Sequence, residues 1–102
     1  DQRVQIEQGF IDDLLAHLSK DMVAYGMDDV SNAAQIGALK SVGVSEGFLR
    51  KSRAEERFDA VDALLREVDA ADGAVVFVHD EQLAKTLDGL GGIGGVLRWK
   101  IR

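Results

Sequence analysis

The chain has 102 residues, which is long enough to bury one hydrophobic core and too short for two, so we expect a single domain. It contains no cysteine, which excludes disulfides, thiolate metal sites and a thiol nucleophile. The formal net charge of −6 argues against a protein whose affinity comes from neutralising phosphates. No long apolar run suggests a membrane span, and we expect a cytoplasmic protein.

The first expected element is a helix over residues 1–20. Its apolar side chains recur at helical spacing along a wide arc, formed by Ile6, Phe10, Ile11, Leu14, Leu15 and Leu18. A short extended segment is expected at residues 22–25, ended by Gly26. The chain starts with Asp1 and not with methionine, from which we expect that it was excised from a longer protein.

Helices and strands are expected to alternate through the middle of the chain. The expected elements are a helix with Asp28 and Asp29 in its first turn, a strand over residues 39–44, a short helix capped by Ser45, a long helix over residues 53–71, a strand over residues 74–78 and a last helix capped by Asp80. The run at 74–78 is apolar without alternation, which predicts a strand at the centre of the sheet, buried on both faces.

Five of the eleven glycines lie between Gly89 and Gly95. Gly89, Gly91 and Gly94 fit the G-x-G-x-x-G pattern of dinucleotide-binding loops. That loop follows a strand and opens a helix, whereas here a helical segment precedes the glycines and a strand-like segment follows. We therefore interpret the glycines as a close-packed turn.

The segment after the glycines predicts the last strand. Leu97, Trp99 and Ile101 alternate with charged residues, the period of a strand with one buried face, so Trp99 is expected to point into the core. Together the elements predict a three-layer α/β/α sandwich around a mixed, largely parallel sheet of about four strands.

Candidate catalytic chemistry is weak in this sequence. His79, Asp80 and Glu81 follow the apolar strand, where ligand sites of open α/β sheets form, and they could supply an acid–base pair or a metal ligand. Adjacent residues point in different directions, however, and the other histidine, His17, lies on a polar helix face. We therefore expect no catalytic residues, metal or cofactor.

Two sequence blocks resemble one family. The first is KDMVAYGMDDVSNAAQIGALKSVGVSEGFLR at residues 20–50, and the second is LDGLGGIGGVLRWKI at residues 87–101. They resemble the C-terminal domain shared by Pelota, the messenger-RNA surveillance and ribosome-rescue factor, and the class I release factors of eukaryotes and archaea. The motifs that carry the resemblance are Tyr25-Gly26, Asp28-Asp29, Gly37-Ala38, Gly91-Gly92-Ile93 and Leu97-Arg98-Trp99.

The resemblance implies a non-catalytic docking domain without a cofactor or small-molecule ligand. Its implied partners are an elongation-factor-like translational GTPase, the iron–sulfur ATPase that recycles ribosomes, and the ribosome as part of the full-length protein. The missing cysteines and the short connection from Arg50 to Glu55 favour the Pelota branch, whereas Gly94-Gly95 is similar to eukaryotic release factors. A Gly-Gly-Gln tripeptide upstream of Asp1 would favour a release factor.

The first helix and the segment after it carry more apolar residues than one core face needs, as partner surfaces do. We expect Val23 and Tyr25, with Phe10 and Leu14 of the helix, to face the GTPase. The hydroxyl of Tyr25 needs water or a partner, which favours its place at an interface. Two other functions stay open: a small nucleotide-binding enzyme using the glycines, and RNA binding, against which the acidic charge argues.

Overall fold

The computed structural model describes residues 2–101 of the chain. Its elements, in order, are α1 (Gln2–Leu18), β1 (Val23–Tyr25), α2 (Met27–Gln35), β2 (Leu39–Ser45), α3 (Glu46–Ala54), α4 (Phe58–Ala70), β3 (Ala74–Val78), α5 (Glu81–Asp88) and β4 (Ile93–Leu97). The expected order of helices and strands is confirmed.

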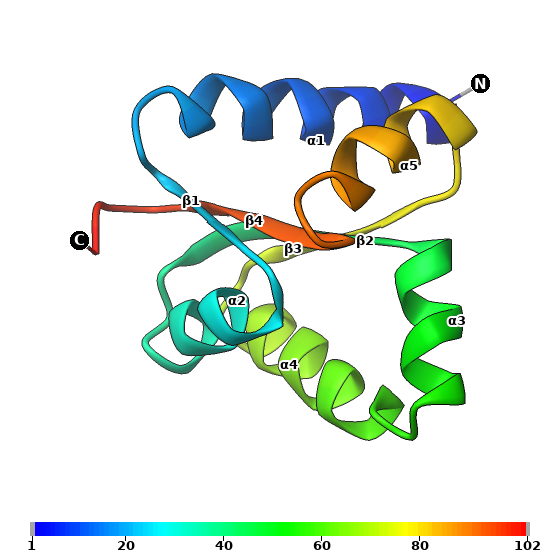
Figure 1. Cartoon of the computed structure of the whole chain (residues 1–102). Helices are drawn as coiled ribbons and strands as arrows, with labels where there is room; N and C mark the ends of the chain where they lie inside the picture. Colours follow the sequence, from blue (N-terminus) through cyan, green and yellow to red (C-terminus); the bar gives the residue numbers. More distant parts are fainter. Residues whose placement is uncertain (1, 102) are drawn as a thin grey trace.

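The elements form three layers (Figure 1). α1 and α5 cover one face of the four-stranded sheet, and α2, α3 and α4 lie on the other. The core of the first face is formed by Phe10, Ile11, Leu14, Val23, Val78, Leu83, Leu87 and Val96. The core of the second face includes Val30, Ala33, Ala34, Leu39, Val42, Val44, Leu64, Val68, Ile93 and Leu97. The predicted sandwich is therefore confirmed.

The sheet is mixed, but the prediction of a largely parallel sheet is wrong. The strand order is β1-β4-β2-β3; β2 and β3 are parallel, and β4 runs antiparallel to both β1 and β2. The cause is the short connection between β3 and β4. An eight-residue helix is only about 12 Å long, and the turn after it brings Ile93 beside Val44, near the end of β2. β4 must therefore run back along β2.

Two further predictions are corrected in the middle of the chain. β3 lies at the edge of the sheet and not at its centre, and Phe77 is exposed. The apolar sequence of β3 is explained by its packing, because α1 and α4 both contact this edge strand. The helix expected over residues 53–71 is divided: α3 ends at Ala54, and α4 begins at Phe58 after a turn in which Glu56 has a φ of 58°.

The last strand lies earlier than predicted, because Gly94 and Gly95 belong to it. A Cβ on Gly95 would lie 2.6 Å from Cδ2 of Leu39 and 2.7 Å from the carbonyl oxygen of Ser41, so the close packing of β4 on β2 requires glycine there. β4 ends at Leu97, and Trp99 and Ile101 are exposed beyond it. The prediction that Trp99 points into the core is wrong.

The local capping signals were predicted correctly. Oγ of Ser45 accepts the Phe48 N–H at 3.1 Å and caps α3, while Oδ1 of Asp80 accepts the Gln82 and Leu83 N–H groups at 3.0 Å and caps α5. Across residues 2–101, none of the helices has the length and apolar character needed to cross a bilayer.

Candidate partner-binding surface

Tyr25 stands at the exposed end of an edge strand. β1 pairs only with β4 in the described sheet, with Tyr25, its last residue, opposite Gly94. The N–H of the next residue, Gly26, donates to the Ile93 carbonyl at 3.0 Å. The Tyr25 side chain is 45% exposed, although Val23 and Ala24 before it are buried. A large amphipathic ring on a fixed strand is suited to an interface, because little order is lost on binding.

The other three residues expected at the interface lie in the core. Phe10 and Leu14 point from α1 onto the sheet, and Val23 joins the same cluster from β1; their exposures are 6%, 0% and 6%. A partner cannot reach these side chains in this conformation. Partner binding itself stays a prediction, and Tyr25 is the residue of the set that is available for it.

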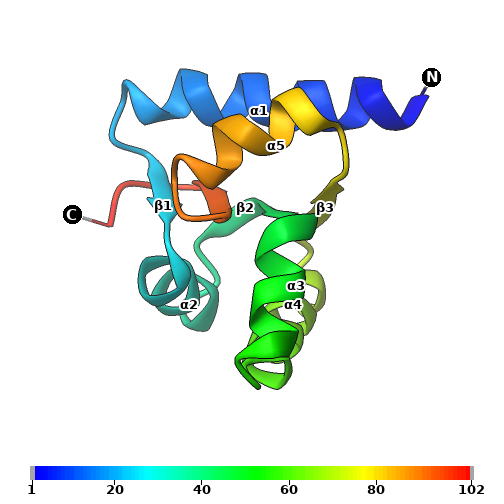
Figure 2. The ribbon, with the colours of Figure 1, turned by 45° about the vertical axis from the view of Figure 1, so that its right-hand side comes forward.

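Two exposed leucines lie in the last part of α1, the end of the helix that leads into β1. Leu15 and Leu18 are 44% and 39% exposed, and a short turn leads from Leu18 to β1, with the Met22 N–H donating to the His17 carbonyl at 3.0 Å. Tyr25 lies on the same face of the sheet as α1, two residues after Val23. We call Leu15, Leu18 and Tyr25 the α1–β1 surface; Figure 2 shows the two elements meeting at one end of the sheet.

A buried carboxylate on α1, that of Glu7, connects this helix to the turn between β3 and α5. Glu7 is 1% exposed, and its Oε1 accepts the backbone N–H groups of His79 at 2.7 Å and Asp80 at 2.8 Å. Its Oε2 is buried and has no hydrogen-bond partner among residues 2–101. The sequence analysis missed Glu7, although a glutamate one turn before Phe10 and Ile11 on the apolar face of a helix is an available signal.

The His79, Asp80 and Glu81 group has structural tasks. Asp80 caps α5, Glu81 lies in the first turn of that helix, and Nδ1 of His79 lies 2.8 Å from Oε1 of Glu46. Nowhere in the described part of the chain do three histidine, aspartate or glutamate side chains come together as metal ligands do. The glycine turn also lacks the geometry of a dinucleotide loop, because α5 precedes it and β4 follows.

The fold is that of a small α/β domain with a mixed four-stranded sheet, and its sequence defines the family. Residues 4–101 match the family described as eRF1 domain 3. The chain belongs to this family, in the form of the C-terminal domain of Pelota homologues. A "Protein pelota homolog" of Methanosarcina barkeri is 38% identical over 104 residues, which cover 100% of this chain and 29% of the relative. The chain thus spans less than a third of the length of that relative.

Solved structures agree with this assignment. The crystal structure of Archaeoglobus fulgidus Pelota matches with a TM-score of 0.86 and 39% identity, over 98% of this chain and 31% of that one. S. cerevisiae Dom34, described as a translation termination-like factor of RNA quality control that interacts with Hbs1, matches with a TM-score of 0.78 and 27% identity, over 88% of this chain and 26% of that one. Archaeal Pelota, in a model bound to the ribosome with ABCE1, matches with a TM-score of 0.75 and 26% identity, over 99% of this chain and 27% of that one.

Proposed function

We propose that this chain is the docking domain of a Pelota-like factor that recognises stalled ribosomes in the cytoplasm. It would act by binding an elongation-factor-like translational GTPase and the ATPase that recycles ribosomes. The observation that carries the proposal is the likeness to Archaeoglobus fulgidus Pelota at 39% identity over 98% of the chain. The interaction of Dom34 with Hbs1 and the complex of archaeal Pelota with ABCE1 on the ribosome support a function in protein binding.

The α1–β1 surface is the site that we assign to the GTPase. It combines one half-exposed aromatic ring with two half-exposed leucines, and aromatic anchors contribute most of the energy at protein interfaces. Polar residues border it, because Ser19, Lys20 and Asp21 form the exposed turn between α1 and β1. The proposed role involves no chemical step, so the domain would act by positioning other parts of its protein.

A release-factor domain is the closest alternative, since the family itself is described by a release factor. The curated relatives favour Pelota: proteins from Methanosarcina barkeri and Archaeoglobus fulgidus that are 38% and 39% identical over nearly the whole chain are both Pelota homologues. The sequence upstream of Asp1 in the parent protein tests this choice, because a Gly-Gly-Gln tripeptide there would indicate a release factor.

The docking proposal is tested by titrating the chain with the elongation-factor-like GTPase of the same organism in a calorimeter. We expect Tyr25→Ala to raise the Kd at least about tenfold, as loss of an interface anchor does. Phe77→Ala is the matched control, because Phe77 is 44% exposed but lies on the opposite edge strand. We expect its Kd to stay within about twofold of the parent value. Unchanged affinity of a folded Tyr25→Ala variant would refute the assigned surface.

A further inference from the structure

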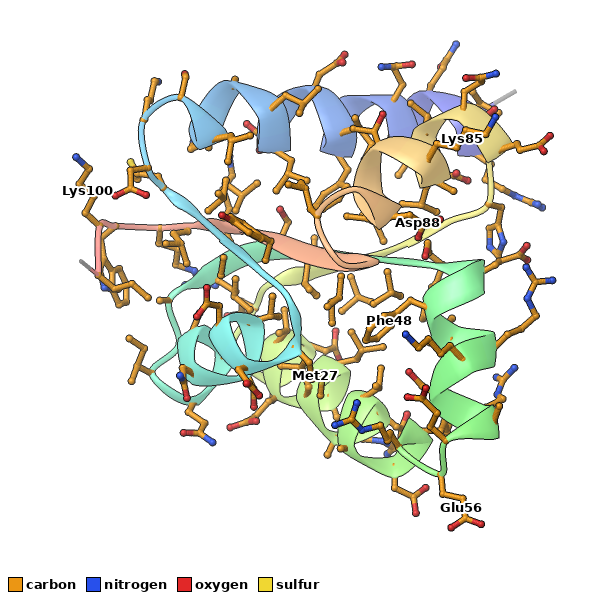
Figure 3. The ribbon with its side chains drawn as sticks, in the orientation of Figure 1. Met27, Phe48, Glu56, Lys85, Asp88 and Lys100 are labelled. Carbon is orange, nitrogen blue, oxygen red and sulfur yellow. The ribbon has the colours of Figure 1, made fainter. Side chains whose placement is uncertain are left out.

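A cleft of about 600 Å³ opens between α3 and α4. Both helices lie on the face of the sheet away from α1 (Figure 2). Its apolar lining comes from Phe48 on α3, Ala60 and Val61 on α4, Met27 at the start of α2 and the backbone of Gly92. In Figure 3, Phe48 projects from α3 into the space below the sheet, and Met27 lies across from it. The volume is in the range of binding pockets that enclose a few large side chains or a small molecule.

The walls of the cleft are fixed by local contacts. Gly92 has a φ of 85°, and a Cβ there would lie 2.8 Å from Cβ of Phe48, so only glycine lets α3 lie this close to the turn. Oγ of Ser52 donates to the Phe48 carbonyl at 2.8 Å, and the Arg57 N–H donates to the Ser52 carbonyl at 2.7 Å. These bonds hold α3 and the following turn in place. A ligand would therefore meet a preformed site, at a low cost in conformational entropy.

The charges at the rim select the chemistry of the ligand. Three carboxylates, Glu55, Glu56 and Asp88, stand against two cations, Lys51 and Arg57. Nη1 of Arg57 lies 3.7 Å from Oε1 of Glu55, so part of the positive charge is already compensated within the rim. The remaining excess is negative, as is the whole chain at −6. With two cations against three carboxylates, the rim carries a net charge of −1, which favours lysine and arginine over phosphates.

We infer that the α3–α4 cleft binds a basic amphipathic helix of a partner protein, with an apolar side chain against Phe48 and Ala60 and lysine or arginine at the rim. The apolar lining and the acidic rim together match the helix-in-groove mode of recognition. This inference goes beyond the docking through the α1–β1 surface, because the cleft lies on the other side of the sheet. One domain would then hold two protein partners at once.

The test uses a synthetic helical peptide with leucine on one face and lysine on the other, labelled with a fluorophore. A matched peptide with glutamate in place of lysine is the charge control. We expect the lysine peptide to bind the chain at least about tenfold more tightly than the glutamate peptide in anisotropy titrations. Its binding should shift the amide resonances of Phe48, Ser52 and Val61 in NMR spectra. Equal binding of both peptides, or shifts confined to α1, would overturn the inference.

Two pairs of variants locate the site. Ala60→Arg fills the cleft from an exposed helix position, and Ala63→Arg places the same side chain on α4 outside the lining. We expect a loss of lysine-peptide affinity of at least about tenfold for the first and less than twofold for the second. The charge pair compares the double variant Glu55→Gln/Glu56→Gln, which should weaken binding about threefold or more, with Glu67→Gln/Asp69→Asn, which should not.

Other occupants of the cleft would give different results. A concentration-dependent dimer that Ala60→Arg dissociates would show that a second copy of the chain occupies the cleft, and tight binding of dinucleotides there would show a small-molecule site; each would overturn the inference. Tyr25→Ala should leave peptide binding unchanged. Failure of the cleft and failure of the α1–β1 surface are therefore distinguishable.

Discussion

The two faces of the sheet are covered in different ways. Under α1 and α5 the packing is closed: Leu14 and Leu87 are 0% exposed, and the Glu7 carboxylate joins α1 to the β3–α5 turn. On the other face, α3 extends away from the sheet beside α4 (Figure 1). The cleft opens between these two helices. The closed face can offer partners only the outer side chains of its edge, whereas the open face offers a hollow. The two faces therefore suit partners of different shape.

The closed face should be the most sensitive to cavity formation. Leu14→Ala removes a fully buried side chain between α1 and the sheet, and we expect it to lower the free energy of unfolding by about 2–5 kcal/mol. Urea unfolding measures this change. Leu15→Ala is the control, because the same residue type next along the helix is 44% exposed, and it should cost less than about 1 kcal/mol. Similar losses for both variants would mean that α1 is rotated so that Leu15 also packs against the sheet.

The second largest loss of stability is expected when the buried carboxylate of Glu7 is removed. Glu7→Ala leaves the N–H groups of His79 and Asp80 without their acceptor, and we expect a loss of about 1–3 kcal/mol in the free energy of unfolding. Hydrogen exchange gives a local measurement: the His79 and Asp80 amides should exchange faster in the variant, relative to amides in β2. Gln5→Ala, at an exposed position of α1, is the control and should change neither quantity. Unchanged exchange in Glu7→Ala would show that the carboxylate does not hold this turn.

The sequence was sufficient where the signal is local. Ser45 and Asp80 were predicted as helix caps because a cap depends on residues within one turn, and the structure confirms both. The order of helices and strands followed from apolar periodicity in the same way. Strand pairing depends instead on how far each connection reaches. The reversal of β4 follows from the short α5 and the turn after it, and alternation of helices and strands gives no sign of this.

The candidate site was predicted only in part for a related reason. The apolar arc of α1 is wide, and periodicity could not decide which part of it faces the sheet. The structure places Phe10 and Leu14 inside and Leu15 outside. The cleft is a product of tertiary packing: Phe48 and Gly92 are far apart in the sequence and meet only when β4 lies beside β2. The glycine motif was visible, but its contact with α3 was not.

The smallest change in stability is expected for Trp99, which follows the end of β4. β4 ends at Leu97, and the Arg98 N–H donates to the Ala38 carbonyl at 2.7 Å. Trp99 follows this contact, outside the strand. Because the Trp99 side chain is 47% exposed, Trp99→Ala should cost less than about 1 kcal/mol. The control is Phe10→Ala, at an aromatic residue that is 6% exposed in the closed face; it should lower the free energy of unfolding by about 3–5 kcal/mol.

Trp99 is the single tryptophan, so its fluorescence gives an independent measurement. Acrylamide should quench this fluorescence in the folded protein nearly as well as in the urea-unfolded chain. Protection from acrylamide, together with a loss above about 3 kcal/mol in Trp99→Ala, would show that the ring is packed and that the sheet continues past Leu97.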